Sequence, residues 1–235
     1  MAISFNRKEI QTMKKILYTS FLSAALIVTP FSPILGENES VVEAAYINPF
    51  TDVKDSNSHA NSIVSLYNEG IVTGVTTTTY QPGKEATRGD AALYLANALG
   101  LNVVAVENLG FKDVPTTSKY YQAVAALKQA DIVGGYGDEF RPNATLTRAQ
   151  LAKMLTVGFD LEQASSTTTK FTDVNKLTDA ATKRYIQTLV NYEITKGTTA
   201  TTFSPNMKLT RGQLATFLFN AMQATDDELT VITVE

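Results

Sequence analysis

Three arginines occupy the same local position, each directly after a threonine. They are Arg88, Arg148 and Arg211, spaced 60 and 63 residues apart. Threonine followed three residues later by Asp or Gln is the pattern of a capping box, so each arginine is expected at the first position of a helix. The helix dipole makes a cation there unfavourable by about 0.3 kcal/mol or more, which suggests a role outside the helix. A guanidinium beside free N–H groups of a helix N-terminus would form a site for a carboxylate or phosphate.

Three aspartates recur in a second motif, Phe-x-Asp-Val, at a similar spacing. They are Asp52, Asp113 and Asp173. Their carboxylates could orient the arginines or accept hydroxyl groups of a sugar. They could equally cap a helix or a turn beside a buried phenylalanine. A further alternative is that each arginine pairs with the aspartate of its own or a neighbouring motif and fixes a loop, and such a surface pair contributes little stability.

A glycine lies between these two motifs each time, shortly before an aromatic-x-Pro sequence. The three glycines are Gly74, Gly135 and Gly197. Each is a candidate for positive φ or for close approach of a ligand to the backbone, and a plain turn explains each of them as well. The motif phenylalanines are predicted to be core residues, namely Phe50, Phe111 and Phe171. Three tyrosines could pack on the face of a sugar ring, namely Tyr120, Tyr121 and Tyr136.

The motifs recur in the same order with a period near 60 residues, so most of the chain consists of three copies of one sequence repeat. Apolar residues at helical spacing follow each Phe-x-Asp-Val motif, and a second apolar stripe follows each Thr-Arg motif. Each repeat is therefore predicted to be a helix, a long loop and a second helix. The predicted repeats span residues 46–109, 110–169 and 170–224, and a tail of residues 225–235 follows.

Two short helices cannot bury their apolar stripes alone, so the repeats must share a core. An open solenoid of three copies would leave two uncapped ends, whereas a closed arrangement leaves none. The predicted fold is therefore all-α, with three helix-loop-helix repeats closed into a pseudo-threefold bundle. The tail is interpreted as a strand or as a partner-binding extension.

The composition excludes several classes of protein. The chain has 235 residues, 44% of them hydrophobic, which suffices for a substantial core. Twenty Lys and Arg against 23 Asp and Glu give a net charge of −3, without the cationic field that nucleic-acid binding requires. The absence of cysteine excludes zinc ribbons and thiol nucleophiles. The single histidine, His59, excludes multi-histidine metal sites and is expected to be a surface or capping residue.

The first 44 residues are predicted to be a secretory signal peptide. Basic residues precede an apolar run over residues 16–28, and Pro30 follows it. A run of about 13 residues is short of the roughly 20 that span a bilayer, so cleavage is expected after Ala44 or Ala45. No membrane contact is expected after cleavage, because no second long apolar segment follows.

In this combination and order, the motifs resemble those of the S-layer homology (SLH) domain family, as a three-repeat module over about residues 46–224. The resemblance implies a noncovalent anchor that binds pyruvylated secondary cell-wall polysaccharide on Gram-positive peptidoglycan, through grooves between the repeats. A pyruvate-ketal carboxylate would fit the anion sites described above. The fourth residue of the Thr-Arg motif is typically Glu in this family, and here it is Asp90, Gln150 and Gln213.

The resulting expectation is a monomeric binding module on the bacterial cell surface, without a cofactor, metal or catalytic residue. A catalytic centre is ordinarily unique, whereas the carboxylates that stand out here recur three times. Two alternatives remain open: a structural surface-layer protein, or an accessory of a cell-wall hydrolase that acts through a protein partner. The candidate ligand-binding residues are the three arginines, the three motif aspartates and the three glycines.

Overall fold

Helices joined by long loops make up the described part of the chain. The computed structural model describes residues 47–101 and 110–231, with side chains as far as residue 225, so the predicted signal peptide lies outside the described residues. Within these limits there are seven helices and only isolated β-bridges. The helices are α2 (Ala60–Asn68), α3 (Arg88–Ala98), α4 (Tyr121–Gln129), α5 (Arg148–Gly158), α6 (Thr172–Asn175), α7 (Ala180–Asn191) and α8 (Arg211–Val231). The all-α prediction is confirmed.

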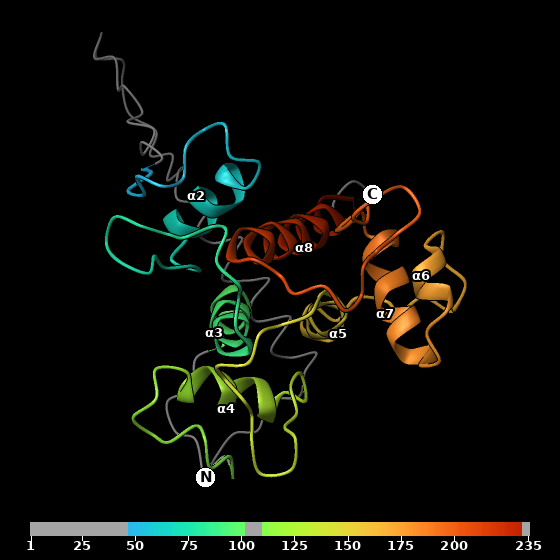
Figure 1. Cartoon of the computed structure of the whole chain (residues 1–235), viewed down its shortest axis with the longest axis horizontal. Coiled ribbons are helices and arrows are strands. Elements are labelled where there is room, and N and C mark those ends of the chain that lie inside the picture. The colour runs from blue at the N-terminus through green and yellow to red at the C-terminus, as the bar shows by residue number, and fades with distance from the viewer. Residues whose placement is uncertain (1–46, 102–109, 232–235) are drawn as a thin grey trace, which may run out of the picture. The chain divides into compact units, whose positions relative to one another are not determined.

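Three of these helices begin at the Thr-Arg motifs, and Figure 1 shows these three, α3, α5 and α8, near the centre with α2, α4 and α7 outside them. The predicted capping boxes are present. At α3 the Thr87 hydroxyl accepts the backbone N–H of Asp90, whose carboxylate in turn accepts the N–H of Thr87. Reciprocal bonds of this kind satisfy backbone donors that the first helical turn leaves unpaired.

The outer helices pack across the boundaries between repeats. Helix α4 of the second repeat lies on α3 of the first, and α7 of the third lies on α5 of the second. Helix α2 of the first repeat lies on α8 of the third, so the series returns to its start. The prediction of a closed bundle is therefore confirmed.

A cycle of three backbone hydrogen bonds lies at the centre of the bundle. Ala86 N–H donates to the carbonyl oxygen of Leu209 at 2.8 Å, Leu209 N–H to that of Leu146 at 2.9 Å, and Leu146 N–H to that of Ala86 at 3.0 Å. Each of these residues directly precedes a capping threonine and is fully buried, with 0% of its surface exposed. Since buried backbone groups must be paired, each repeat here satisfies a donor or acceptor of the other two.

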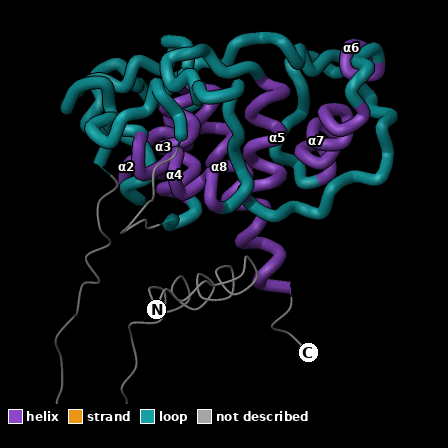
Figure 2. Tube along the Cα trace, turned by 90° about the horizontal axis from the view of Figure 1, so that it is seen from below, coloured by secondary structure: helices purple, strands orange, loops and turns teal. Residues whose placement is uncertain are grey.

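The motif phenylalanines lie in the core, as predicted. Each packs against the aromatic residue of the aromatic-x-Pro sequence in its own repeat. The pairs are Phe50 with Tyr80, Phe111 with Phe140 and Phe171 with Phe203, with ring centroids 5.4, 5.8 and 5.8 Å apart. Figure 2 shows the loops gathered along one side of the helices.

Two details differ from the sequence-based expectation. The Phe-x-Asp-Val segment of the third repeat forms a short helix of its own, α6, which was not predicted. The interpretation of the tail as a strand is wrong for residues 225–231, because α8 continues without interruption to Val231. Residues 232–235 lie outside the described part.

Candidate ligand-binding site

Each motif arginine lies against the aromatic-x-Pro loop of the next repeat. Its guanidinium covers the aromatic ring, and its Nε donates a hydrogen bond to the carbonyl oxygen of the same aromatic residue. The pairs are Arg88 with Phe140, Arg148 with Phe203 and Arg211 with Tyr80, with Nε–O distances of 3.0, 2.7 and 2.9 Å. The guanidinium carbons lie 4.7, 4.5 and 4.6 Å from the ring centroids. All three candidate sites are thus composite, made by two repeats.

The prediction of free N–H groups at these helix N-termini is wrong. The first two N–H groups of α3 donate to the carbonyl oxygens of Ala144 and Pro142 at 2.9 and 2.8 Å. The loops of the other repeats do the same at α5 and α8, through Met207 and Pro205 and through Lys84 and Pro82. The neighbouring repeat therefore occupies the N–H donors that an anion would have used. Of the two groups predicted to form each anion site, only the guanidinium remains.

The motif aspartates fix the loops of their own repeats. Asp52 accepts the backbone N–H groups of Tyr80 and Gln81 at 2.8 and 2.7 Å. The equivalent bonds join Asp113 to Phe140 and Arg141 at 2.8 and 2.6 Å, and Asp173 to Phe203 and Ser204 at 3.0 and 2.7 Å. The second donor has positive φ each time, at 59°, 61° and 58°. Because this conformation strains a non-glycine residue by about 1 kcal/mol or more, the carboxylate stabilises an otherwise unfavourable turn.

No hydrogen bond or ion pair joins a motif aspartate to a motif arginine among the described residues. The interpretation of the aspartate as a turn residue beside a buried phenylalanine therefore agrees with the structure. Burial by itself would raise the pKa of Asp173, but hydrogen bonds from the N–H groups of Phe203, Ser204 and Val174 outweigh it and hold the pKa below its ordinary value. The carboxylate also acts at longer range, since its charge raises the pKa of Arg148.

The motif glycines lie against the motif phenylalanines. A Cβ atom on Gly74 would come within 2.6 Å of the Phe50 ring, and the same crowding is found at Gly135 with Phe111 and at Gly197 with Phe171, at 2.2 and 2.4 Å. Only Gly197 has positive φ, at 93°. Lack of space for a side chain thus explains all three glycines, and the predicted positive φ holds for one of them.

The three arginines differ in how their terminal nitrogens are paired. Nη2 of Arg88 donates to the carbonyl oxygen of Gly134 at 3.2 Å. Nη2 of Arg211 donates to that of Thr73 at 2.9 Å, and its Nη1 lies 3.5 Å from the Asp90 carboxylate. Nη2 of Arg148 is buried and has no hydrogen-bond partner in the described part of the chain. An unpaired buried donor is costly, so this nitrogen is the strongest candidate contact for a ligand acceptor.

Sequence reasoning missed the residue that distinguishes the boundary between the second and third repeats. Lys196 directly precedes the motif glycine, where the other repeats have Thr73 and Gly134. Its side chain is exposed, whereas Arg148 beside the same loop is only 4% exposed. Burial lowers the pKa of Arg148 to about 10. Comparing the three glycine-containing segments residue by residue would have singled out this lysine.

Of the tyrosines suggested for sugar stacking, Tyr136 is the most exposed, at 45%, whereas Tyr120 is buried. The guanidinium carbons of Arg88 and Arg141 lie 5.1 and 4.7 Å from the Tyr136 ring centroid. The Tyr136 hydroxyl accepts a hydrogen bond from Gln150 at 3.1 Å. Gln150, which stands where this family typically has Glu, thus completes a capping box and also bonds to an exposed tyrosine.

His59, the N-cap of α2, is half-buried against Gly212 of α8, and its Nδ1 lies 2.8 Å from the Thr216 hydroxyl. Burial lowers the pKa of His59. In the described ranges, no group of three or more His, Asp or Glu side chains could hold a metal ion. Over the same residues, no helix combines the length and the apolarity needed to cross a membrane.

Comparison with known families gives one clear match. The sequence model of the S-layer homology domain matches residues 49–92, 110–152 and 170–215, which together make up more than half of the chain. Each matched stretch begins near a Phe-x-Asp-Val motif and extends beyond the following Thr-Arg motif. The residues that build the three arginine-centred boundaries therefore all lie within the matched stretches.

Several curated proteins share this part of the sequence. The chain is 30% identical to a surface-layer 125 kDa protein of Lysinibacillus sphaericus, over 89% of this chain and 17% of that protein. It is 29% identical to S-layer protein sap of Bacillus anthracis, over 84% of this chain and 23% of that protein. An endoglucanase of Bacillus sp. (strain KSM-635) is 28% identical, over 83% of this chain and 21% of the enzyme. The chain thus spans about a fifth of the length of these relatives.

Proposed function

Because the chain belongs to the S-layer homology domain family, we propose that it anchors noncovalently to the bacterial cell wall by binding a secondary cell-wall polysaccharide. The binding sites are the boundaries between repeats, and the ligand group is an anion such as a pyruvate-ketal carboxylate. The module acts at the cell surface as a monomer and has no catalytic centre of its own.

The observation that carries this proposal is the unpaired Nη2 of Arg148. A carboxylate oxygen from a ligand would accept its hydrogen bond, and charge-assisted bonds of this kind are about twice as strong as neutral ones. Exposed Lys196 adds a positive charge on the loop that leads to Phe203, the residue that Arg148 contacts. Because Arg148 contacts Phe203 of the next repeat, a ligand bound here would touch two repeats at once.

The relatives support anchoring in a different way. Proteins named as surface-layer proteins and a protein named as an endoglucanase match this chain over the same kind of segment, which is about a fifth of each. A part shared by proteins of such different names is more simply a common attachment module than a catalytic domain. We therefore favour binding over catalysis for this chain.

The test is co-sedimentation of the full chain with Gram-positive cell walls, either native or stripped of secondary polymer by acid. The proposal expects sedimentation with native walls only, and weaker sedimentation as salt is raised, because ionic contacts are screened. Equal binding to stripped walls would instead identify peptidoglycan as the ligand and contradict the proposal. Size-exclusion chromatography should give a monomer, whereas sheets or large aggregates would favour the alternative of a surface-layer lattice.

A further inference from the structure

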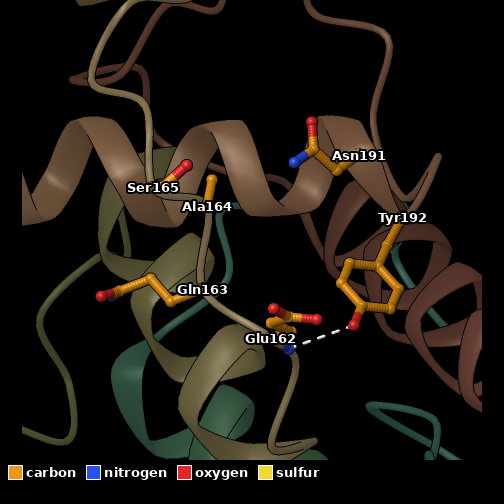
Figure 3. Close-up of a pocket in the computed structure, with 6 residues that line it drawn as sticks. All are labelled: Glu162, Gln163, Ala164, Ser165, Asn191 and Tyr192. Atoms are coloured by element: carbon orange, nitrogen blue, oxygen red, sulfur yellow. Dashed lines mark hydrogen bonds between the residues drawn. The ribbon is translucent and has the colours of Figure 1, made fainter.

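An open hollow of about 530 Å³ lies away from the three arginines, where the segment after α5 passes the C-terminal end of α7 (Figure 3). Its lining is mostly polar and comprises Glu162, Gln163, Ala164, Ser165, Asn191 and Tyr192. None of the motif arginines, aspartates or glycines contributes to it. The proposed function above therefore leaves this hollow unexplained.

The wall of the hollow is held in place by contacts that need no ligand. The backbone N–H of Glu162 donates to the Tyr192 hydroxyl at 3.1 Å, drawn as the dashed line in Figure 3. The N–H of Ala164 donates to the Thr188 hydroxyl at 2.9 Å, and Ala164 itself is buried. A pocket whose walls are fixed in advance costs less conformational entropy to fill.

The first repeat contains a counterpart of Asn191 that has a partner. Asn68 and Asn191 each lie three residues before the isoleucine that follows the first helix of their repeats, Ile71 and Ile194. The Asn68 Oδ1 accepts the backbone N–H of Ile47 at 3.1 Å, and its Nδ2 donates to the Ile47 carbonyl oxygen at 3.0 Å. The asparagine amide thus holds both main-chain groups of one residue.

In the third repeat, the residue equivalent to Ile47 bonds to a different side chain. Thr168 occupies the position of Ile47, three residues before the motif phenylalanine. Its N–H donates to the Ser166 hydroxyl at 3.0 Å, and that hydroxyl donates to the Thr168 carbonyl oxygen at 3.2 Å. The Asn191 Oδ1 accepts only from Gln187, at 2.7 Å, and its Nδ2 has no partner among the described residues. The amide that holds backbone in the first repeat therefore lines an open hollow in the third.

We infer that this hollow binds a short extended peptide, whose main-chain N–H and C=O pair with Asn191 as those of Ile47 pair with Asn68. Glu162, exposed at the same hollow and outside every ion pair among the described residues, selects a peptide with an amino group on its side chain. The site is separate from the arginine-centred boundaries and goes beyond the proposed function.

The test is an NMR titration of the ¹⁵N-labelled full chain with the tripeptide acetyl-alanyl-lysyl-alanine amide. Saturable shifts are expected at the amides of Glu162 and Tyr192. Asn191→Leu should weaken binding about tenfold, since two hydrogen bonds are lost. Asn206→Leu, at another exposed asparagine, should leave the affinity unchanged. A tripeptide with an acetylated lysine amine should bind about threefold more weakly, because its charge is gone.

Absence of saturable shifts, or equal affinity of the Asn191→Leu variant, would overturn the inference. So would binding of free N-acetylglucosamine in place of the peptide, since a sugar would then be the ligand. Circular dichroism establishes that the variant is folded. Co-sedimentation of the same variant with native walls separates the two proposals: if the peptide site alone is lost, wall binding through the arginines persists.

Discussion

The guanidinium carbon of Arg211 lies 4.6 Å from the ring centroid of Tyr80, a residue 131 positions earlier in the chain. The contact runs in both directions, because Arg211 Nε donates to the Tyr80 carbonyl oxygen at 2.9 Å and the Tyr80 hydroxyl donates to the Arg211 carbonyl oxygen at 3.3 Å. Burial raises the pKa of Tyr80, so the phenol remains a donor across the physiological range. This pair joins the third repeat to the first.

Replacing Arg211 with lysine should therefore destabilise the whole bundle. A lysine keeps the charge but cannot place a planar donor group over the ring while bonding to the Tyr80 carbonyl oxygen. The expected loss in free energy of unfolding is about 2 kcal/mol, measured by urea denaturation. Arg184→Lys, at a half-buried arginine of α7, should change stability by less than about 0.5 kcal/mol. Equal effects of the two substitutions would argue against the contact.

Arg148 and Arg88 should respond differently to replacement by methionine. At Arg88 the change removes a hydrogen bond from Nη2 to Gly134, whereas at Arg148 it removes a buried nitrogen that has no partner. Arg148→Met should thus cost about 1 kcal/mol less stability than Arg88→Met. It should nevertheless reduce co-sedimentation with native walls more strongly. The reverse order in the wall-binding assay would exclude Arg148 as the main ligand contact.

Asp173 should make the protein sensitive to acid. Its folded-state pKa is lowered, so its stabilising contribution is complete above the unfolded pKa near 3.9 and is lost as the pH falls through the folded value. Asp173→Asn should cost about 1 kcal/mol at pH 7 and much less near pH 2, in urea denaturation at both values. The exposed Asp55→Asn provides the control. A cost that does not change with pH would contradict this assignment.

The residue that follows the C-cap of α2, α4 and α7 has positive φ, but only α2 has a glycine there. Gly70, Asp131 and Glu193 have φ of 72°, 55° and 54°. Glu193→Gly should relieve backbone strain and raise the free energy of unfolding by about 0.5 kcal/mol, after the greater freedom of glycine in the unfolded chain is allowed for. The converse change, Gly70→Glu, should lower it by a similar amount. Thermal denaturation measures both.

Features encoded by neighbouring residues could be predicted from the sequence. The capping threonines, the helix that follows each of them and the burial of Phe50 all depend on local spacing and on apolar periodicity. The closed bundle followed from the number of repeats and from the need to bury two helical stripes. For the helix starts and the closed arrangement, the threefold recurrence of the motifs was sufficient to predict what the structure shows.

Contacts between repeats could not be predicted in the same way. A period near 60 residues is compatible with contact of Arg88 either with Tyr80 of its own repeat or with Phe140 of the next. The sequence does not distinguish the two, whereas the structure shows contact with Phe140. The carbonyl oxygens of Ala144 and Pro142 belong to a loop about 55 residues further along the chain. Local spacing therefore could not indicate that they accept the N–H groups of α3. The N–H groups that were predicted to accompany each arginine are therefore already paired, and the role of the arginines in anion binding stays a prediction.

The cycle of hydrogen bonds through Ala86, Leu146 and Leu209 has a consequence for how the protein unfolds. In a linear repeat array the outermost units have one neighbour each and can fray first. Here every unit has two neighbours, so there is no end from which unravelling could start. Detaching any one unit breaks two interfaces together and leaves the other two with an exposed core. We therefore expect the bundle to unfold in a single cooperative transition.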